Sequence, residues 1–144
     1  MLVRDVLRAK GGGVVTIGAE CTVGEAISRM VQNNIGSLPV VDADGELVGI
    51  FSERDALRIV DERGETFRTA RVSDVMSADP ATCDLDNDLD CVLRQMSERR
   101  IAKVPVMSAG RLVGIISVGD MIKHQYEQAR ADNVHLMSYI HGSF

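Results

Sequence analysis

An internal duplication constrains the fold of this chain more than any single motif does. Residues 45–58 align with residues 110–123 at an offset of 65, and seven of the fourteen aligned positions are identical. The segment 3–7 likewise recurs at 72–76. Two copies of one unit therefore account for most of the 144 residues, and each copy is predicted to fold into the same structural unit.

Both copies predict the same series of elements. Each begins with a helix that has a polar N-cap and apolar residues at the spacing of one buried helical face. A short apolar strand, a turn with glycine and a second strand follow, and a serine with an aspartate three positions later then starts another helix. The predicted N-caps are Thr22 and Asp88, the strands are 38–41, 47–51, 104–107 and 112–116, the turn glycines are Gly45 and Gly110, and the final helices start at Ser52 and Ser117.

These elements predict an α/β (α+β) fold of two β-α-β-β-α units with a C-terminal helix. A unit this small leaves one face of its sheet exposed, so the two units are expected to be related by a pseudo-twofold axis and packed sheet to sheet. The predicted boundaries are 2–61 for the first domain, 62–71 for a linker, 72–124 for the second domain and 125–144 for a helical tail.

Composition limits the classes of partner. The net charge of −5 and the aromatic content of 3% oppose nucleic-acid binding, which needs clustered cations and stacking side chains. No apolar run reaches the length of a membrane span, so no membrane partner is expected. Cys21, Cys83 and Cys91 are widely spaced in a chain without an apolar leader, which favours a cytoplasmic location and a role as buried small hydrophobes.

Two heptapeptides carry a resemblance to a known family. Gly49-Ile50-Phe51-Ser52-Glu53-Arg54-Asp55 and Gly114-Ile115-Ile116-Ser117-Val118-Gly119-Asp120 lie in matched register, and each follows a Pro-Val strand that contains Pro39 or Pro105. This pattern resembles a tandem pair of cystathionine-β-synthase (CBS) domains, the arrangement called a Bateman module. The similarity covers residues 2–124 and extends to stand-alone bacterial proteins with two CBS domains.

The resemblance implies a regulatory sensor and not an enzyme. In this family a cleft between the two copies holds an adenosine-containing ligand, such as AMP, ADP, ATP, NAD or S-adenosylmethionine, as an effector, and no cofactor is required. Paired modules of the family often form homodimers. A protein target of unknown identity is expected to respond when the ligand binds.

Residue chemistry is compatible with such a ligand. Asp55 or Asp120 can accept both hydroxyls of a ribose diol, and Ser52 or Ser117 lies at a helix start, where free N–H groups favour a phosphate. Arg54 can bind a phosphate through two hydrogen bonds, whereas the second copy has Gly119 at the matching position. The other predicted contacts are Thr16, Thr82 and Lys103, the apolar Ile17, Ile35, Leu38, Pro39, Ile101, Val104 and Pro105, and the motif residues Ile115 and Val118.

Several alternatives remain open. Ser-x-x-Asp is also an ordinary capping box, so the module could be a structural or interaction unit with degenerate ligand sites, or a small enzyme of unrecognised geometry. The acids 84–90 lack the glycine and glutamate of a calcium loop and are expected to mark a helix start. In the tail, an apolar stripe interrupted near Asn133 is expected to pack on its own module or on a partner chain.

Overall fold

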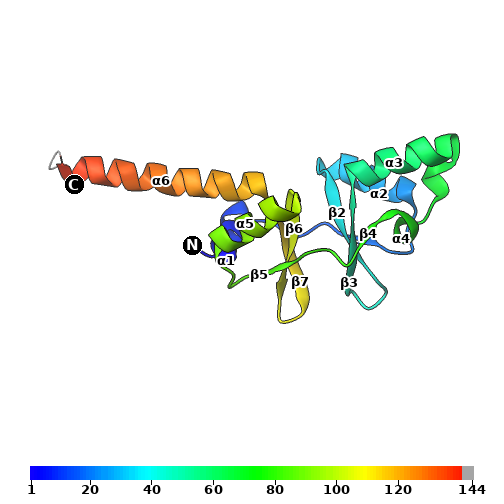
Figure 1. Cartoon of the computed structure of the whole chain (residues 1–144), viewed down its shortest axis with the longest axis horizontal. Coiled ribbons are helices and arrows are strands. Elements are labelled where there is room, and N and C mark those ends of the chain that lie inside the picture. The colour runs from blue at the N-terminus through cyan, green and yellow to red at the C-terminus, as the bar shows by residue number, and fades with distance from the viewer. Residues whose placement is uncertain (141–144) are drawn as a thin grey trace. The chain divides into compact units, whose positions relative to one another are not determined.

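The computed structural model of the protein describes residues 1–140 (Figure 1). The predicted β-α-β-β-α series occurs in both copies, together with further elements that were not predicted. The helices and strands are α1 (Val3–Lys10), β1 (Ile17–Gly18), α2 (Val23–Asn33), β2 (Ser37–Val41), β3 (Leu47–Ser52), α3 (Glu53–Arg63), the 3-10 helix η1 (Gly64–Thr69), α4 (Val72–Val75), β4 (Ser77–Ala78), β5 (Cys83–Asp84), α5 (Leu89–Arg99), β6 (Lys103–Ser108), β7 (Arg111–Ser117) and α6 (Val118–Ile140).

The strands form one sheet in each copy. The first sheet has the order β1-β2-β3-β4 and is mixed, because β1 runs parallel to β2 while β2 and β3 are antiparallel. In the second sheet the order is β5-β6-β7. The turn between β6 and β7 places Ala109 and Gly110 at φ values of 50° and 77°, as a two-residue hairpin turn requires. The predicted α/β fold with two repeated units and a long C-terminal helix is confirmed.

The described chain divides into two compact units. The central unit contains residues 13–82 and 105–115. The terminal unit contains residues 1–12 and 83–104 and the chain from residue 116 onward. These units are assembled from pieces of both sequence repeats, so the boundaries predicted along the sequence stay a prediction.

The short helix that precedes each repeat packs in the unit of the other repeat. In the central unit, Val72 at the start of α4 donates its backbone N–H to the oxygen of Cys21, at 2.9 Å. In the terminal unit, Val3 at the start of α1 donates to the oxygen of Asn87, at 3.0 Å. The two copies therefore exchange equivalent helices, α1 for α4.

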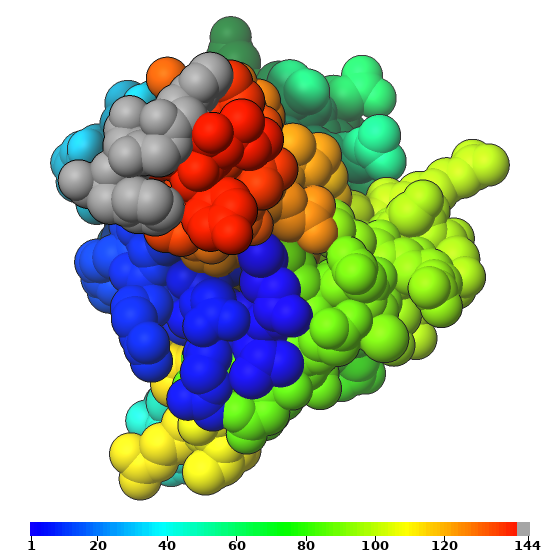
Figure 2. Space-filling view, turned by 90° about the vertical axis from the view of Figure 1, so that its left-hand side faces the viewer, coloured from blue at the N-terminus to red at the C-terminus, as the bar shows by residue number. Residues whose placement is uncertain are grey.

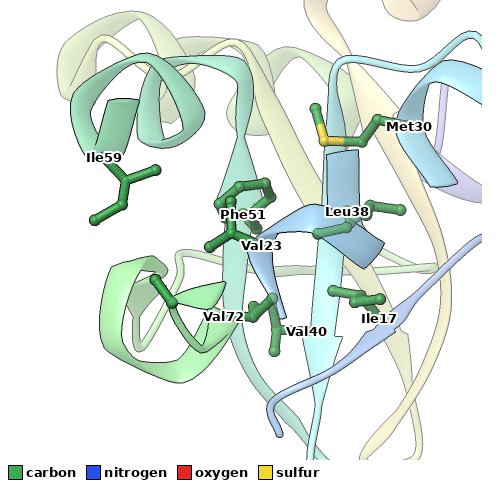
Figure 3. Packing of buried hydrophobic residues seen from close by; sticks show 10 residues of the cluster. Ile17, Val23, Met30, Leu38, Val40, Phe51, Ile59 and Val72 are labelled. Carbon is green, nitrogen blue, oxygen red and sulfur yellow. The ribbon is translucent and has the colours of Figure 1, made fainter. Parts of the chain in front are cut away.

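The core of the central unit explains why its elements form where they do. Figure 3 shows Phe51 of β3 packed among apolar side chains of α2, β2 and α4, and all of them are shielded from solvent. Gly49 allows β4 to approach β3, because a Cβ at this position would lie 2.8 Å from the backbone oxygen of Ser77. The predicted N-caps are confirmed, since Thr22 accepts from the N–H of Glu25 and Asp88 accepts from that of Cys91.

Two predicted segments have further structure. The segment 62–71, predicted as a linker, contains η1, which packs against α2 and α3. The predicted tail continues α6 without interruption to residue 140, and residues 141–144 lie outside the described residues. Among the helices of residues 1–140, none combines the length and the apolar character needed to cross a membrane.

Candidate functional site

The first candidate site is the junction between β3 and α3. Ser52 is in an extended conformation and ends the strand, and its hydroxyl oxygen accepts from the N–H of Asp55 at 3.4 Å. In return, Oδ2 of Asp55 accepts from the backbone N–H of Ser52 at 2.9 Å and from its hydroxyl at 3.0 Å. This reciprocal capping box fixes the start of α3.

The carboxylate of Asp55 has little access to solvent. The residue is 3% exposed, and Nη1 of Arg58 lies 3.6 Å from Oδ1. One carboxylate oxygen therefore caps the helix, while the other faces a guanidinium one turn along the same helix. This arrangement satisfies a buried charge without any ligand.

The second junction, between β7 and α6, has the same reciprocal hydrogen bonds between backbone and side chain and a different environment. Oδ2 of Asp120 accepts from the N–H of Ser117 at 2.9 Å, and the N–H of Asp120 donates to the hydroxyl of Ser117 at 3.0 Å. The Asp120 side chain is 28% exposed, and Lys10 donates to the same Oδ2 at 2.9 Å. Its second oxygen, Oδ1, keeps capacity to accept from a ligand.

The charge state of Asp120 follows from these contacts. Partial burial raises the pKa of the carboxyl, but the hydrogen bonds from Lys10 and Ser117 outweigh that effect, so the pKa of Asp120 lies below its ordinary value. The group is therefore an anion at neutral pH. It is positioned to accept hydrogen bonds from hydroxyl groups.

Lys10 reaches this carboxylate because α1 packs against the first part of α6 within the terminal unit, and Figure 2 shows the blue and the orange segments next to each other. A cavity of about 160 Å³ lies between the two helices. This volume is smaller than the roughly 300 Å³ or more of most ligand pockets, so the cavity as it stands has room for no more than a small group, the size of a sugar or a phosphate. Its lining residues are Val6, Ala9, Lys10, Asp120, Lys123, His124 and Glu127.

The other predicted contact residues differ in exposure. In the central unit Ile17 and Leu38 are fully buried members of the hydrophobic core, and Pro39 and Pro105 are also buried. The half-buried residues of this unit are Thr16, Ile35 and Ile115. Arg54 and Thr82 are exposed. In the terminal unit Val104 is buried, Ile101, Lys103 and Val118 are half-buried, and Gly119 is exposed. Each junction brings its serine and aspartate into direct contact. The buried apolar residues contribute to the core behind the junctions.

Two features were missed by reasoning from the sequence. Lys10 was not a candidate, because a lysine in the last turn of a helix is common and gives no sign of a partner 110 positions away. The second feature is an apolar groove of about 610 Å³ between α2 and α3. Val31 and Leu57 on its lining are exposed, and the only signal in the sequence was that both are apolar residues on these two helices.

The prediction that all three cysteines are buried is confirmed for Cys83 only, because Cys21 is half-buried against the core and Cys91 is exposed. Cys83 is buried, and desolvation raises the pKa of its thiol to about 11, as expected for an inert core residue. Cys91, however, is exposed. It follows Asp90 on the outer face of α5, where the apolar stripe of Leu89 and Val92 does not include it.

The acids before α5 serve as local caps. Asp88 caps the helix, Oδ1 of Asp84 accepts from the N–H of Asp86, and the side chain of Asp86 forms an ion pair with Arg4. The prediction that this cluster marks a helix start is confirmed.

Comparisons with known proteins agree with this geometry. The sequence profile of the CBS domain matches residues 3–62 and 72–127. The chain is 37% identical over 121 residues to the inosine-5'-monophosphate dehydrogenase of Methanocaldococcus jannaschii, which covers 83% of this chain but only 23% of the length of that protein. It is 31% identical to the CBS domain-containing protein YhcV of Bacillus subtilis, over 82% of this chain and 83% of YhcV.

Solved structures show the same fold. A CBS-domain containing protein from Agrobacterium tumefaciens superposes with a TM-score of 0.81 at 38% identity, covering 87% of this chain and 99% of that one. The CBS domain pair of protein MJ0100, in complex with 5'-methylthioadenosine and S-adenosyl-L-methionine, has a TM-score of 0.78 at 27% identity, over 89% and 98% of the two chains. A CBS domain protein from Pyrobaculum aerophilum complexed with AMP shares the fold, with a TM-score of 0.75 at 23% identity over 83% and 89%. Because the family profile matches both halves of the sequence, the chain belongs to the CBS domain family and contains a tandem pair of CBS domains.

Proposed function

We propose that this chain is a non-enzymatic regulatory module that binds an adenosine-containing ligand, with AMP, ADP, ATP and NAD as the candidates. The observation that carries the proposal is the partly exposed Asp120 carboxylate, which Ser117 holds at the start of a long helix. A charged carboxylate with a spare acceptor oxygen suits the hydroxyls of a ribose. The complex of protein MJ0100 with two adenosine derivatives supports the ligand class.

Signalling in this proposal depends on the contact between α1 and α6. Asp120 lies in the first turn of α6 and Lys10 at the end of α1, so a ligand hydroxyl that donates a hydrogen bond to Oδ2 in place of Lys10 weakens the link between these helices. A ligand shifts such an equilibrium only by its differential affinity for the two arrangements. A partner protein, or a second copy of this chain in a homodimer, would respond to the change. A cytoplasmic location is part of this proposal, and free thiols at all three cysteines support it.

A second candidate function, a structural module with a degenerate site, is favoured by Asp55. That carboxylate is 3% exposed, and both of its oxygens face groups of the protein. We therefore propose that the first junction is structural and that the second junction binds the ligand. The purely structural alternative would hold if neither junction binds adenosine compounds.

Thermal unfolding with adenosine, AMP, ADP, ATP and NAD tests the proposed function. At a ligand concentration of about a hundred times the dissociation constant, linkage adds roughly 2.7 kcal/mol to the free energy of unfolding. We expect a rise of several degrees in Tm for at least one compound. No shift at millimolar concentrations of every compound would reject ligand binding, and consumption of a compound would identify an enzyme.

The Lys10–Asp120 ion pair gives a second expected result. Removing the ammonium in Lys10→Met frees Oδ2 for a ribose hydroxyl, and partly exposed ion pairs of this kind contribute about 0.4 to 1 kcal/mol. Calorimetric titration with uncharged adenosine should therefore show a two- to five-fold gain in affinity.

Lys123→Met is the matched control for this measurement. Lys123 lines the same cavity, and its charge is removed without disturbing the ion pair between Lys10 and Asp120. We expect unchanged adenosine affinity in this variant. Equal effects of the two substitutions would show that the total positive charge around the cavity, and not competition between Lys10 and the ligand for Asp120, controls the affinity for adenosine.

A further inference from the structure

The distal part of α6 presents side chains to solvent that its own unit does not cover. Near its start the helix packs on α1 and α5, and Gln125 donates to Asp90 of α5 at 3.2 Å. From residue 126 to residue 140 every side chain is exposed except Ser138, which is half-buried. Figure 1 shows this part of the helix extending past α1 and α5.

The exposed residues follow a heptad pattern. One stripe of α6 has alternating spacings of four and three residues, which is the spacing of the a and d positions of a coiled coil. The apolar side chains on it are more than half exposed, at 56% for Ile122, 65% for Tyr126, 55% for Leu136 and 64% for Ile140. The stripe consists of Ile122, Tyr126, Ala129, Asn133, Leu136 and Ile140.

This stripe is distinct from the surface that α6 uses within its own unit. The side chains of α6 that line the cavity beside α1 are Asp120, Lys123, His124 and Glu127, which occupy positions b, e and f of the same heptads. The a and d positions are therefore available to another molecule. Charges of both signs on the remaining surface, such as Arg130 and Asp132, oppose a membrane-surface helix, which favours a basic polar face.

Asn133 interrupts the stripe at an a position. A single asparagine at such a position fixes the register of a coiled coil and favours two strands, because each amide then pairs with the same residue of the other helix. An apolar stripe that packed on an arbitrary surface would gain nothing from this residue, since the amide would lose hydrogen bonds to water without a partner.

We propose that α6 pairs with α6 of a second copy of this chain, parallel and in register, as a short two-stranded coiled coil. Isolated helices shorter than about fifteen residues are marginal in water. Here α1 and α5 already fix the start of α6, so pairing does not have to nucleate the helix. The proposal does not depend on ligand binding, and the adenosine measurements leave it unaffected.

Sedimentation velocity of the full chain over roughly a hundred-fold range of concentration tests the pairing. We expect a monomer–dimer equilibrium and, in Leu136→Ser, a dissociation constant raised at least about ten-fold. Val134→Ser is the matched control, because Val134 is 58% exposed on the same helix but lies at a b position. A monomeric wild-type chain, or a dimer equally stable in Leu136→Ser, would overturn the proposal.

Disulfide trapping tests the orientation. In a Cys91→Ser background, which removes the exposed native thiol, Leu136→Cys should form a disulfide-linked dimer under mild oxidation, and Val134→Cys should not. An antiparallel pair would separate the two copies of residue 136, so a failure of Leu136→Cys to cross-link would reject the parallel arrangement. Asn133→Ile should tighten association and allow oligomers larger than dimers, and an unchanged dimer would contradict the assigned register.

Discussion

Phe51→Ala is expected to lower the free energy of unfolding by about 3 to 5 kcal/mol. Phe51 is fully buried, and its ring packs against Val23, Leu38 and Val72 (Figure 3), so truncation leaves a cavity in the centre of the central unit. The loss is a large share of the roughly 5 to 15 kcal/mol that usually separates folded and unfolded proteins. Calorimetry should show a Tm lower by about 10 to 20 °C.

Two controls separate cavity formation from other effects. Phe51→Leu retains most of the apolar volume and should lower the free energy of unfolding by less than Phe51→Ala does. Leu57→Ala removes a side chain that is 72% exposed and should change that free energy by no more than about 0.5 kcal/mol. A cost below about 1 kcal/mol for Phe51→Ala would mean that the core around β3 is not packed as described.

The order of elements could be predicted because its signals are local. The caps at Thr22, Ser52 and Asp88 depend on hydrogen bonds between residues three positions apart, and the sequence shows both partners. The duplication itself revealed that such motifs occur twice, whereas the close approach of β4 to Gly49 was not predicted. Signals that join residues a few positions apart can therefore be read from the sequence alone.

The exchange of α1 and α4 could not be predicted, because both segments carry the same short apolar pattern. Nothing in residues 3–7 or 72–76 says which sheet or helix pair they will cover. The same limit applies to the site. The Lys10–Asp120 contact joins residues 110 positions apart, and exposure distinguishes Asp55 from Asp120 only after their neighbours are placed.

The two motif aspartates should give opposite results when each is replaced by alanine. Asp120→Ala removes a charged acceptor of ligand hydroxyls, which is worth roughly 1.5 to 3 kcal/mol, so the affinity for adenosine should fall about ten- to a hundred-fold. Asp55→Ala instead leaves the N–H and hydroxyl of Ser52 without their buried acceptor. It should lower the free energy of unfolding by about 1 to 2 kcal/mol and leave adenosine affinity within two-fold.

Calorimetric titration and denaturant unfolding of both variants measure these effects on the same samples. Asp120→Asn and Asp55→Asn serve as controls, since each keeps the size of the side chain and one carbonyl acceptor while losing the charge. If Asp55→Ala weakens adenosine binding while Asp120→Ala does not, the ligand binds at the first junction, and Arg58 moves away from Oδ1 to admit it. If neither variant changes affinity, neither the partly exposed Asp120 nor the buried Asp55 holds the sugar.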